Sequence, residues 1–145
     1  MGDRVTSVEF SENAYEDYRL LQNKVLEDKE RGLENSFNIQ LLKTVNRERD
    51  NLKIDPQHGT YIPRKYIPRG AILKYGTDRL WKIDLVGFWR LIYTITGDSV
   101  KVIAFVLEFM DHDKYNKIFG YKKRWRVYKA KTWVLELADM LQHMG

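Results

Sequence analysis

Residues 80–110, LWKIDLVGFWRLIYTITGDSVKVIAFVLEFM, indicate the fold class most clearly. Three runs in this stretch are rich in β-branched and aromatic residues, and short Gly-containing segments separate them, which is the pattern of consecutive antiparallel strands. The runs are 80–85, 88–95 and 100–110, with Val86-Gly87 and Gly97-Asp98 in the connections. The last run is apolar at nearly every position, so we expect it to be a central strand that is covered on both faces.

Helices are expected before this stretch. Residues 5–10 alternate loosely and predict a strand, after which Ser11 offers an N-cap for a helix of roughly three to four turns. After a break at Gly32, Ser36 can cap a second helix that ends before Pro56. The two helices are close enough in sequence to form an antiparallel hairpin.

The remaining segments complete a small α+β domain. Residues 61–70, YIPRKYIPRG, contain two Ile-Pro-Arg units, and because a residue before proline is pushed into extended geometry, we expect an extended loop or edge segment. Residues 111–121, DHDKYNKIFGY, predict a turn that leads into a short helix. The predicted fold class is α+β: a strand, an N-terminal helical hairpin and then a small curved antiparallel sheet. We expect one domain over 1–121 and a C-terminal helical extension over 122–145.

Composition and charge narrow the class of protein. The chain has 145 residues, no Cys and a formal net charge of +5, which fits one globular domain and excludes disulfide frameworks and thiolate zinc sites. The charge is uneven, since residues 61–131 carry 16 basic and 6 acidic side chains. Such a surface attracts polyanions, most commonly nucleic acid, unless the acidic first half balances it in space. With no apolar run of membrane-spanning length and no signal pattern at its start, we expect a cytoplasmic protein without membrane contact.

Candidate functional residues follow from strand parity. Side chains two apart share a face of a strand, so Lys82 and Asp84 lie on one face, and Arg90 of the next run faces away from its apolar neighbours. The residues that border this patch from just after the third run are His112, Lys114 and Tyr115. The alternative is a solvated, ion-paired sheet face without a function. Because the sequence has no phosphate-binding loop, no paired metal-ligand spacing and no serine-nucleophile motif, proton transfer and charge stabilisation are the chemistry that remains.

A second basic segment, KKRWRVYKAK at 122–131, carries two aromatic residues between its cations. Two interpretations are open: the segment forms a final strand, or it is an arm that contacts nucleic acid through phosphates and base stacking. The candidate nucleic-acid contacts are Lys114, Lys122, Lys123, Arg124 and Arg126. Residues 132–144 place apolar side chains at helical spacing and predict the helix of the extension.

The order of these segments resembles the RelE/ParE toxin superfamily of bacterial and archaeal type II toxin–antitoxin systems, in particular archaeal RelE-like proteins. The resemblance rests on residues 80–95, 100–110 and 111–121 with the preceding loop 54–76, and it spans about residues 5–121. It implies a ribosome-dependent mRNA endonuclease without metal or other cofactor, in which the ribose 2′-OH attacks the adjacent phosphate. It also implies a cognate antitoxin, acidic and partly disordered, as partner.

The resemblance also assigns roles. Arg90 would contact the phosphate in the transition state, Lys82 would supply a second cation, and His112 would act as acid or base. Tyr115 would stack on the nucleotide or form a hydrogen bond to it. The chain departs from the family pattern at Asp84, where members often have a lysine; this carboxylate either serves as a base beside His112 or weakens the nuclease. A ParE-type gyrase inhibitor and a non-catalytic module that binds RNA or protein stay open as alternatives on the same fold.

Overall fold

The computed structural model describes residues 5–120, and the predicted extension at 122–145 therefore lies outside the described part. The helices are α1 (Glu12–Glu30), α2 (Phe37–Ile54), α3 (Arg69–Tyr75) and α4 (His112–Phe119). The strands are β1 (Val5–Phe10), β2 (Thr60–Tyr61), β3 (Trp81–Asp84), β4 (Arg90–Gly97) and β5 (Lys101–Met110). Two 3-10 turns, η1 (Arg64–Tyr66) and η2 (Val86–Phe88), lie in the connections. The α+β class and the three predicted strands at 80–110 are confirmed.

The five strands form one sheet in the order β1-β5-β4-β3-β2. Strands β2 to β5, which follow the hairpin, pair antiparallel with one another as predicted, whereas β1 pairs with β5 in parallel, so the sheet as a whole is mixed and not antiparallel throughout. The reason is that only tight turns impose antiparallel pairing, whereas β1 and β5 are separated by most of the chain. β5 is an interior strand, as predicted, although β4 occupies the middle of the sheet.

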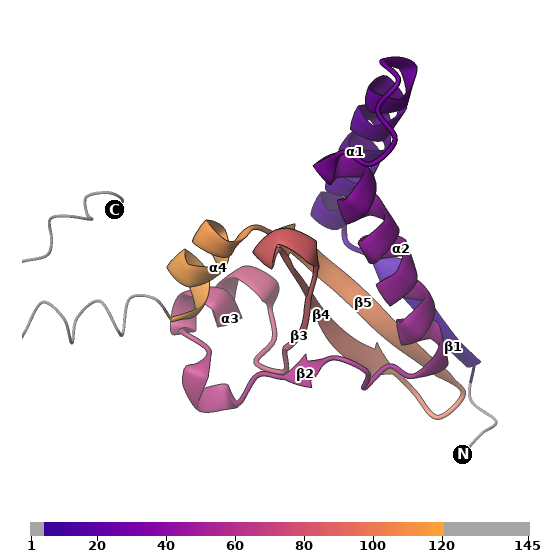
Figure 1. Cartoon of the computed structure of the whole chain (residues 1–145). Coiled ribbons are helices and arrows are strands. Elements are labelled where there is room, and N and C mark those ends of the chain that lie inside the picture. Colours follow the sequence, from indigo (N-terminus) through magenta and orange to yellow (C-terminus); the bar gives the residue numbers. More distant parts are fainter. Residues whose placement is uncertain (1–4, 121–145) are drawn as a thin grey trace, which may run out of the picture.

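The helical hairpin forms where the capping residues predict it. The Oγ atoms of Ser11 and Ser36 accept hydrogen bonds from backbone N–H groups three residues later, at 3.1 and 3.2 Å, which satisfies one free donor of each helix. α1 is longer than expected, 19 residues, and continues until Gly32 supplies a positive φ of 85°. Figure 1 shows α1 and α2 side by side in front of β1 and β5, with α3 and α4 beside each other away from the hairpin.

The buried carboxylate of Asp28 stabilises the turn between α1 and α2. Asp28 accepts hydrogen bonds from the Ser36 hydroxyl at 2.6 Å and from Nδ2 of Asn38 at 3.1 Å, while Arg31 forms an ion pair with it at 3.4 Å. These contacts, led by the Ser36 hydroxyl, hold the pKa of Asp28 below its usual range. The carboxylate therefore ties the first residues of α2 to the end of α1.

Replacing Asp28 by asparagine should lower the Tm at pH 7. A lowered pKa in the folded state means that the carboxylate stabilises the fold above its unfolded pKa of about 4, and that this contribution is lost as the pH falls through the folded value. Thermal unfolding of wild type and Asp28→Asn at pH 7 and pH 3 checks this. The Tm difference should shrink in acid, and a difference that stays constant with pH would contradict the role of the charge.

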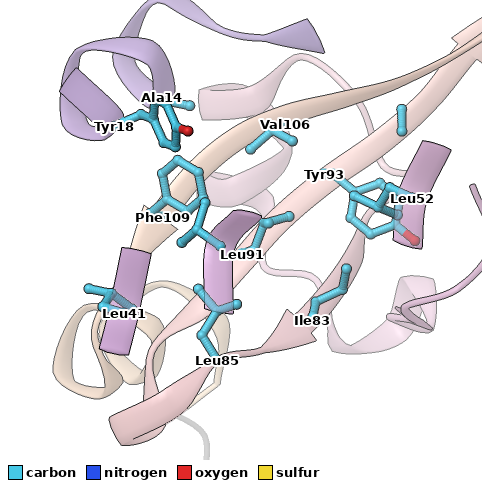
Figure 2. Packing of buried hydrophobic residues seen from close by; sticks show 12 residues of the cluster. Ala14, Tyr18, Leu41, Leu52, Ile83, Leu85, Leu91, Tyr93, Val106 and Phe109 are labelled. Atoms are coloured by element: carbon cyan, nitrogen blue, oxygen red, sulfur yellow. The ribbon is translucent and has the colours of Figure 1, made fainter. Parts of the chain in front are cut away.

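The main core lies between the helical hairpin and one face of the sheet (Figure 2). Tyr18 and Leu41 from the helices pack on Leu91, Val106 and Phe109 from the strands. Phe109 is also brought to this face by a β-bulge: Ile92 pairs with Glu108 but Tyr93 pairs with Val106, so Leu107 is an extra residue. An extra residue reverses which side chains face each side of a strand. It therefore turns Glu108 away from this core.

Tyr93 anchors the loop after α2. Its side chain is fully buried, and its hydroxyl donates a hydrogen bond to the Pro56 carbonyl at 2.7 Å and accepts one from the Gly59 N–H at 3.0 Å. Glycine is required at 59, because a Cβ there would lie 2.7 Å from the Lys82 carbonyl and 2.9 Å from the Tyr93 ring. Burial is the main cause that raises the pKa of Tyr93 to about 12.

Tyr93→Phe should cost about 1–3 kcal/mol at neutral pH, since it leaves the partly buried Pro56 carbonyl and Gly59 N–H without the tyrosine hydroxyl as partner. The raised pKa means that the tyrosine stabilises the fold below its unfolded pKa of about 10, and that this part is lost as the pH rises towards 12. Denaturant unfolding at pH 7 and pH 11.5 measures both effects. The difference in unfolding free energy between wild type and Tyr93→Phe should become smaller at pH 11.5. Tyr15→Phe, at an exposed position of α1, is the control.

A second core covers part of the opposite sheet face. Ile92 and Met110 from the strands pack there with Ala71 of α3 and Phe119 of α4. The segment 61–70, expected to be extended, is extended only at its start: it contains η1, and α3 begins at Arg69. None of the helices within residues 5–120 is both long and apolar enough to cross a bilayer. The candidate residues Lys82, Asp84 and Arg90 lie on this same sheet face, next to α4.

Candidate functional site

Three charged side chains meet on the sheet face that carries α3 and α4. Asp84 of β3 pairs in register with Arg90 of β4, and Lys82 lies two residues before it on the same face. Oδ1 of Asp84 lies 3.2 Å from Nζ of Lys82 and 3.1 Å from Nε of Arg90. The shared face follows from the strand parity that the sequence predicts. Asp84 is therefore the centre of a small network of one anion and two cations.

Arg90 is held from several sides. Its Nη1 donates a hydrogen bond to the Phe88 carbonyl at 2.7 Å, and its guanidinium lies 5.0 Å from the centre of the Tyr115 ring. Nε forms the ion pair with Asp84 but no hydrogen bond in this geometry, and the side chain is only 14% exposed. A guanidinium held in this way is oriented in advance and loses little rotamer freedom when it binds an anion.

His112 lies at the border of this network. It is the first residue of α4, whose N-cap Asp111 accepts a hydrogen bond from the Lys114 N–H at 2.9 Å. The imidazole is exposed, its Nε2 lies 3.0 Å from Nδ2 of Asn116, and its ring centre lies 6.0 Å from that of Phe88. Phe88 thus contacts both Arg90, through its carbonyl, and His112, through its ring.

Phe88 itself has an unusual backbone. Its φ is 65°, in the left-handed region that non-glycine residues rarely adopt, and it follows Gly87 with a φ of 69°. The side chain is 72% exposed although it is large and apolar. Strain of this kind persists where the surrounding structure fixes it, and it is common at binding sites. Phe88 therefore belongs to the candidate site, although nothing in the sequence pattern indicated it.

The Tyr115 ring packs against the Arg90 guanidinium. Its ring stacks on Phe119 with centres 4.9 Å apart. Burial raises the pKa of the Tyr115 hydroxyl, with Arg90 lowering it and Asp84 raising it to a smaller extent. The phenol therefore keeps its proton at neutral pH, so that it can donate a hydrogen bond or present its ring but cannot serve as a base.

A buried carboxylate beneath α4 determines where Lys114 lies. Glu108 is 4% exposed, accepts a hydrogen bond from the Tyr75 hydroxyl at 2.6 Å, and pairs with Nζ of Lys114 and, at 3.8 Å, with Nζ of Lys74. Burial, followed by the contact with Glu108, raises the pKa of Tyr75 well above its usual range. Lys114, a candidate phosphate contact, is thus engaged by Glu108. In the sequence, Glu108 stands out as an acidic residue within an apolar segment. Only the bulge at Leu107 explains why its side chain points away from the main core.

The other candidate phosphate contacts, Lys122, Lys123, Arg124 and Arg126, lie outside the described residues. Within residues 5–120, no cluster of three or more His, Cys, Asp or Glu residues is arranged to hold a metal ion. The described site therefore offers cations, one exposed carboxylate, an imidazole and a phenol. That set can bind a phosphate and move protons.

An apolar groove with a volume of about 400 Å³ lies between the hairpin and the ends of the strands. Leu21 and Phe37 of the helices line it together with Trp89, and Lys24 and Lys114 lie among its polar residues. Phe37 is 44% exposed. Burial raises the pKa of Asp17, which also lines the groove, while Lys114 opposes this shift.

Comparison with known proteins finds similar chains among solved structures. No protein-family model matches the chain. No curated protein matches it either. Among solved structures, the YoeB/ParE toxin from Agrobacterium tumefaciens is similar, with 15% sequence identity and a TM-score of 0.48 over 73% of this chain and 98% of that chain.

Proposed function

We propose that this chain is a metal-independent endoribonuclease that cleaves mRNA on the ribosome, as the toxin of a type II toxin–antitoxin system. The observation that supports this most is the meeting of Arg90, Lys82 and Asp84 on one sheet face, with Tyr115 and His112 of α4 beside them. The excess of cations in the second half of the chain fits an RNA substrate. The sequence resemblance to RelE-like proteins points in the same direction.

The proposed reaction needs only proton transfer and positive charge. The 2′-oxygen of one ribose forms a bond to its own 3′-phosphorus, while the bond between that phosphorus and the next 5′-oxygen breaks. A base removes the 2′ proton and an acid protonates the 5′-oxygen. The products are a 2′,3′-cyclic phosphate and a 5′-hydroxyl. The extra negative charge of the pentavalent transition state has to be stabilised by cations.

The residues divide these tasks according to their chemistry. Arg90 and Lys82 stabilise the phosphate charge, since both cations lie at Asp84 and face the same side. Asp84, with a side chain 64% exposed, accepts the 2′ proton. His112 donates a proton to the leaving 5′-oxygen, a role that histidine often has in general acid–base catalysis. Tyr115 keeps its proton and binds the nucleotide by its ring or hydroxyl.

A second function, RNA binding without cleavage, is favoured by one observation. Arg90 already forms a hydrogen bond to the Phe88 carbonyl, an ion pair with Asp84 and a contact with the Tyr115 ring. These partners explain the position of the Arg90 guanidinium without a role in catalysis. Binding without cleavage would weaken steeply with salt and give no product.

The proposal includes an antitoxin as partner. An acidic, partly disordered chain that folds on contact would be attracted to the basic half of this protein. The groove between the hairpin and the strands offers apolar side chains such as Phe37 and Trp89, while its charged lining residues, Asp17, Lys24, Asp111 and Lys114, balance one another. A helix that folds on contact and has an apolar face fits that chemistry.

A purified translation reaction tests the proposal. We expect wild-type protein to cleave ribosome-bound mRNA and to stop translation, and the double variant Arg90→Ala/His112→Ala to leave the mRNA intact. Intact mRNA with wild-type protein would contradict the nuclease. If that protein still binds RNA in a salt-dependent manner, the second function is supported instead.

A further inference from the structure

A second cavity lies between α3 and α4, beyond the candidate site. Its volume is about 480 Å³, within the range of small-ligand pockets. The segment around η1 and α3 contributes Lys65, Tyr66 and Lys74, and the end of α4 contributes Lys117. The apolar part of the lining includes Ala71 and Phe119, both of which are buried.

The charged side chains that line this cavity are all positive. Its described lining has three lysines and no carboxylate. Lys74 is partly balanced by Glu108, whose Oε1 lies 3.8 Å from Nζ beneath the cavity. Lys65 and Lys117 form no ion pair with any described residue, and the nearest arginine in sequence, Arg64, is engaged by Asp78 at 3.3 Å. Two lysines in the lining of one cavity, neither of which has an ion pair among the described residues, favour an anionic ligand.

Aromatic and apolar groups lie next to these cations. The Tyr66 ring is 52% exposed, with Nζ of Lys65 5.3 Å from its centre. Phe119 stacks on Tyr75 and on Tyr115. A ligand that carries both a phosphate and a flat ring can use the two kinds of surface at once.

We infer that this cavity binds one nucleotide of a single-stranded RNA, with its phosphates on Lys65, Lys74 and Lys117 and its base against Tyr66 and the apolar lining. The inference rests on the proposed function for the choice of RNA as ligand. α4 connects the two places: His112 begins it at the candidate site and Lys117 lies in its last turn at the cavity. Its eight residues span about 12 Å, so one RNA strand can reach both.

Binding of a 2′-O-methyl RNA 15-mer tests this inference, because that RNA cannot be cleaved through a 2′-OH. We expect Lys65→Gln/Lys117→Gln to weaken binding about 20-fold at 0.1 M salt and to reduce the slope of log K against log salt by about 1.4, the loss of two phosphate contacts. The matched control is Lys43→Gln/Lys53→Gln on α2, which removes the same charge from exposed positions. Fluorescence anisotropy over a salt series measures both quantities.

The aromatic part of the inference has its own pair of variants. Tyr66→Leu should weaken RNA binding about 5-fold or more through lost stacking, and Tyr15→Leu, with a similar exposure of 54%, should not. Poly-glutamate of equal charge serves as the competing ligand. If the lysine variants bind RNA like their controls, or if poly-glutamate binds as tightly as RNA and is weakened equally, the inference is wrong and the second case identifies an acidic protein surface.

The test of the cavity and the test of the nuclease can fail independently of each other. A wild-type protein that leaves mRNA uncut while the cavity variants lose RNA binding contradicts the nuclease alone. A protein that cuts mRNA and whose cavity variants bind RNA normally contradicts the cavity alone.

Discussion

Arg90→Ala is expected to reduce the rate of mRNA cleavage by roughly 10²–10³-fold, the usual loss when one group that stabilises a transition-state charge is removed. Arg90 is the best placed cation for this role, since Phe88, Asp84 and Tyr115 fix its guanidinium. Single-turnover cleavage of ribosome-bound mRNA measures the effect. Arg90→Lys should recover only part of the rate, because a lysine keeps the charge but loses the planar fork.

Stability has to be separated from catalysis in this experiment. The lost contact with the Tyr115 ring should cost about 0.5–2 kcal/mol of unfolding free energy, and Asp84 keeps Lys82 as a partner. Arg79→Ala, at an exposed position just before β3, is the matched control and should cleave at the wild-type rate. If Arg90→Ala also cleaves at that rate while its Tm falls, the arginine has only a structural role.

His112→Ala is expected to reduce cleavage by about 10²–10⁴-fold without a loss of stability. The imidazole is exposed and its polar contact is with Asn116 alone among the described residues, so the fold does not depend on it. The loss should appear in the chemical step, with RNA binding unchanged. Cleavage rates at saturating ribosome–mRNA complex and RNA affinity measured separately distinguish the two.

Asp113→Asn is the control for this turn of α4, since it lies next to His112 and is exposed. Its rate should stay close to that of wild type. A His112→Ala protein that cleaves as fast as Asp113→Asn would remove histidine from the reaction, and the proton donor would have to be sought elsewhere.

The local features of the fold could be predicted from the sequence because short-range chemistry determines them. Ser11 and Ser36 cap helices because their hydroxyls reach a backbone N–H three residues later. The shared face of Lys82, Asp84 and Arg90 follows from the two-residue period of a strand and the short connection between β3 and β4. These two rules account for the hairpin and for the charged patch.

The features that were missed depend on distant parts of the chain. The parallel direction of β1 is determined by its pairing with β5, which no turn imposes. The bulge at Leu107 cannot be recognised in the apolar run AFVLEFM, where a simple alternation would place Glu108 in the same core as Val106. Helix α3 has only seven residues, too few for a clear periodicity.

In the candidate site, too, the local features could be predicted and the contacts between distant segments could not. The sequence indicated the charged residues but neither Phe88, whose left-handed backbone places it between Arg90 and His112, nor the ring of Tyr115 as the support of the guanidinium. It also did not indicate that Lys114 pairs with buried Glu108. These contacts arise because α4 packs back on β4 and β5, which is a property of the tertiary fold.

The chemical nature of the ends produced by cleavage tests the proposed 2′-OH attack directly. Ribosome-bound mRNA is treated with wild-type protein, either as all RNA or with a single 2′-deoxynucleotide on the 5′ side of the cleaved bond, and the new ends are identified. We expect a 2′,3′-cyclic phosphate and a 5′-hydroxyl from the all-RNA strand and no cleavage at the deoxynucleotide. Equal cleavage of both strands, or ends with a 5′-phosphate, would contradict attack by the 2′-OH and with it the role given to Arg90, Asp84 and His112.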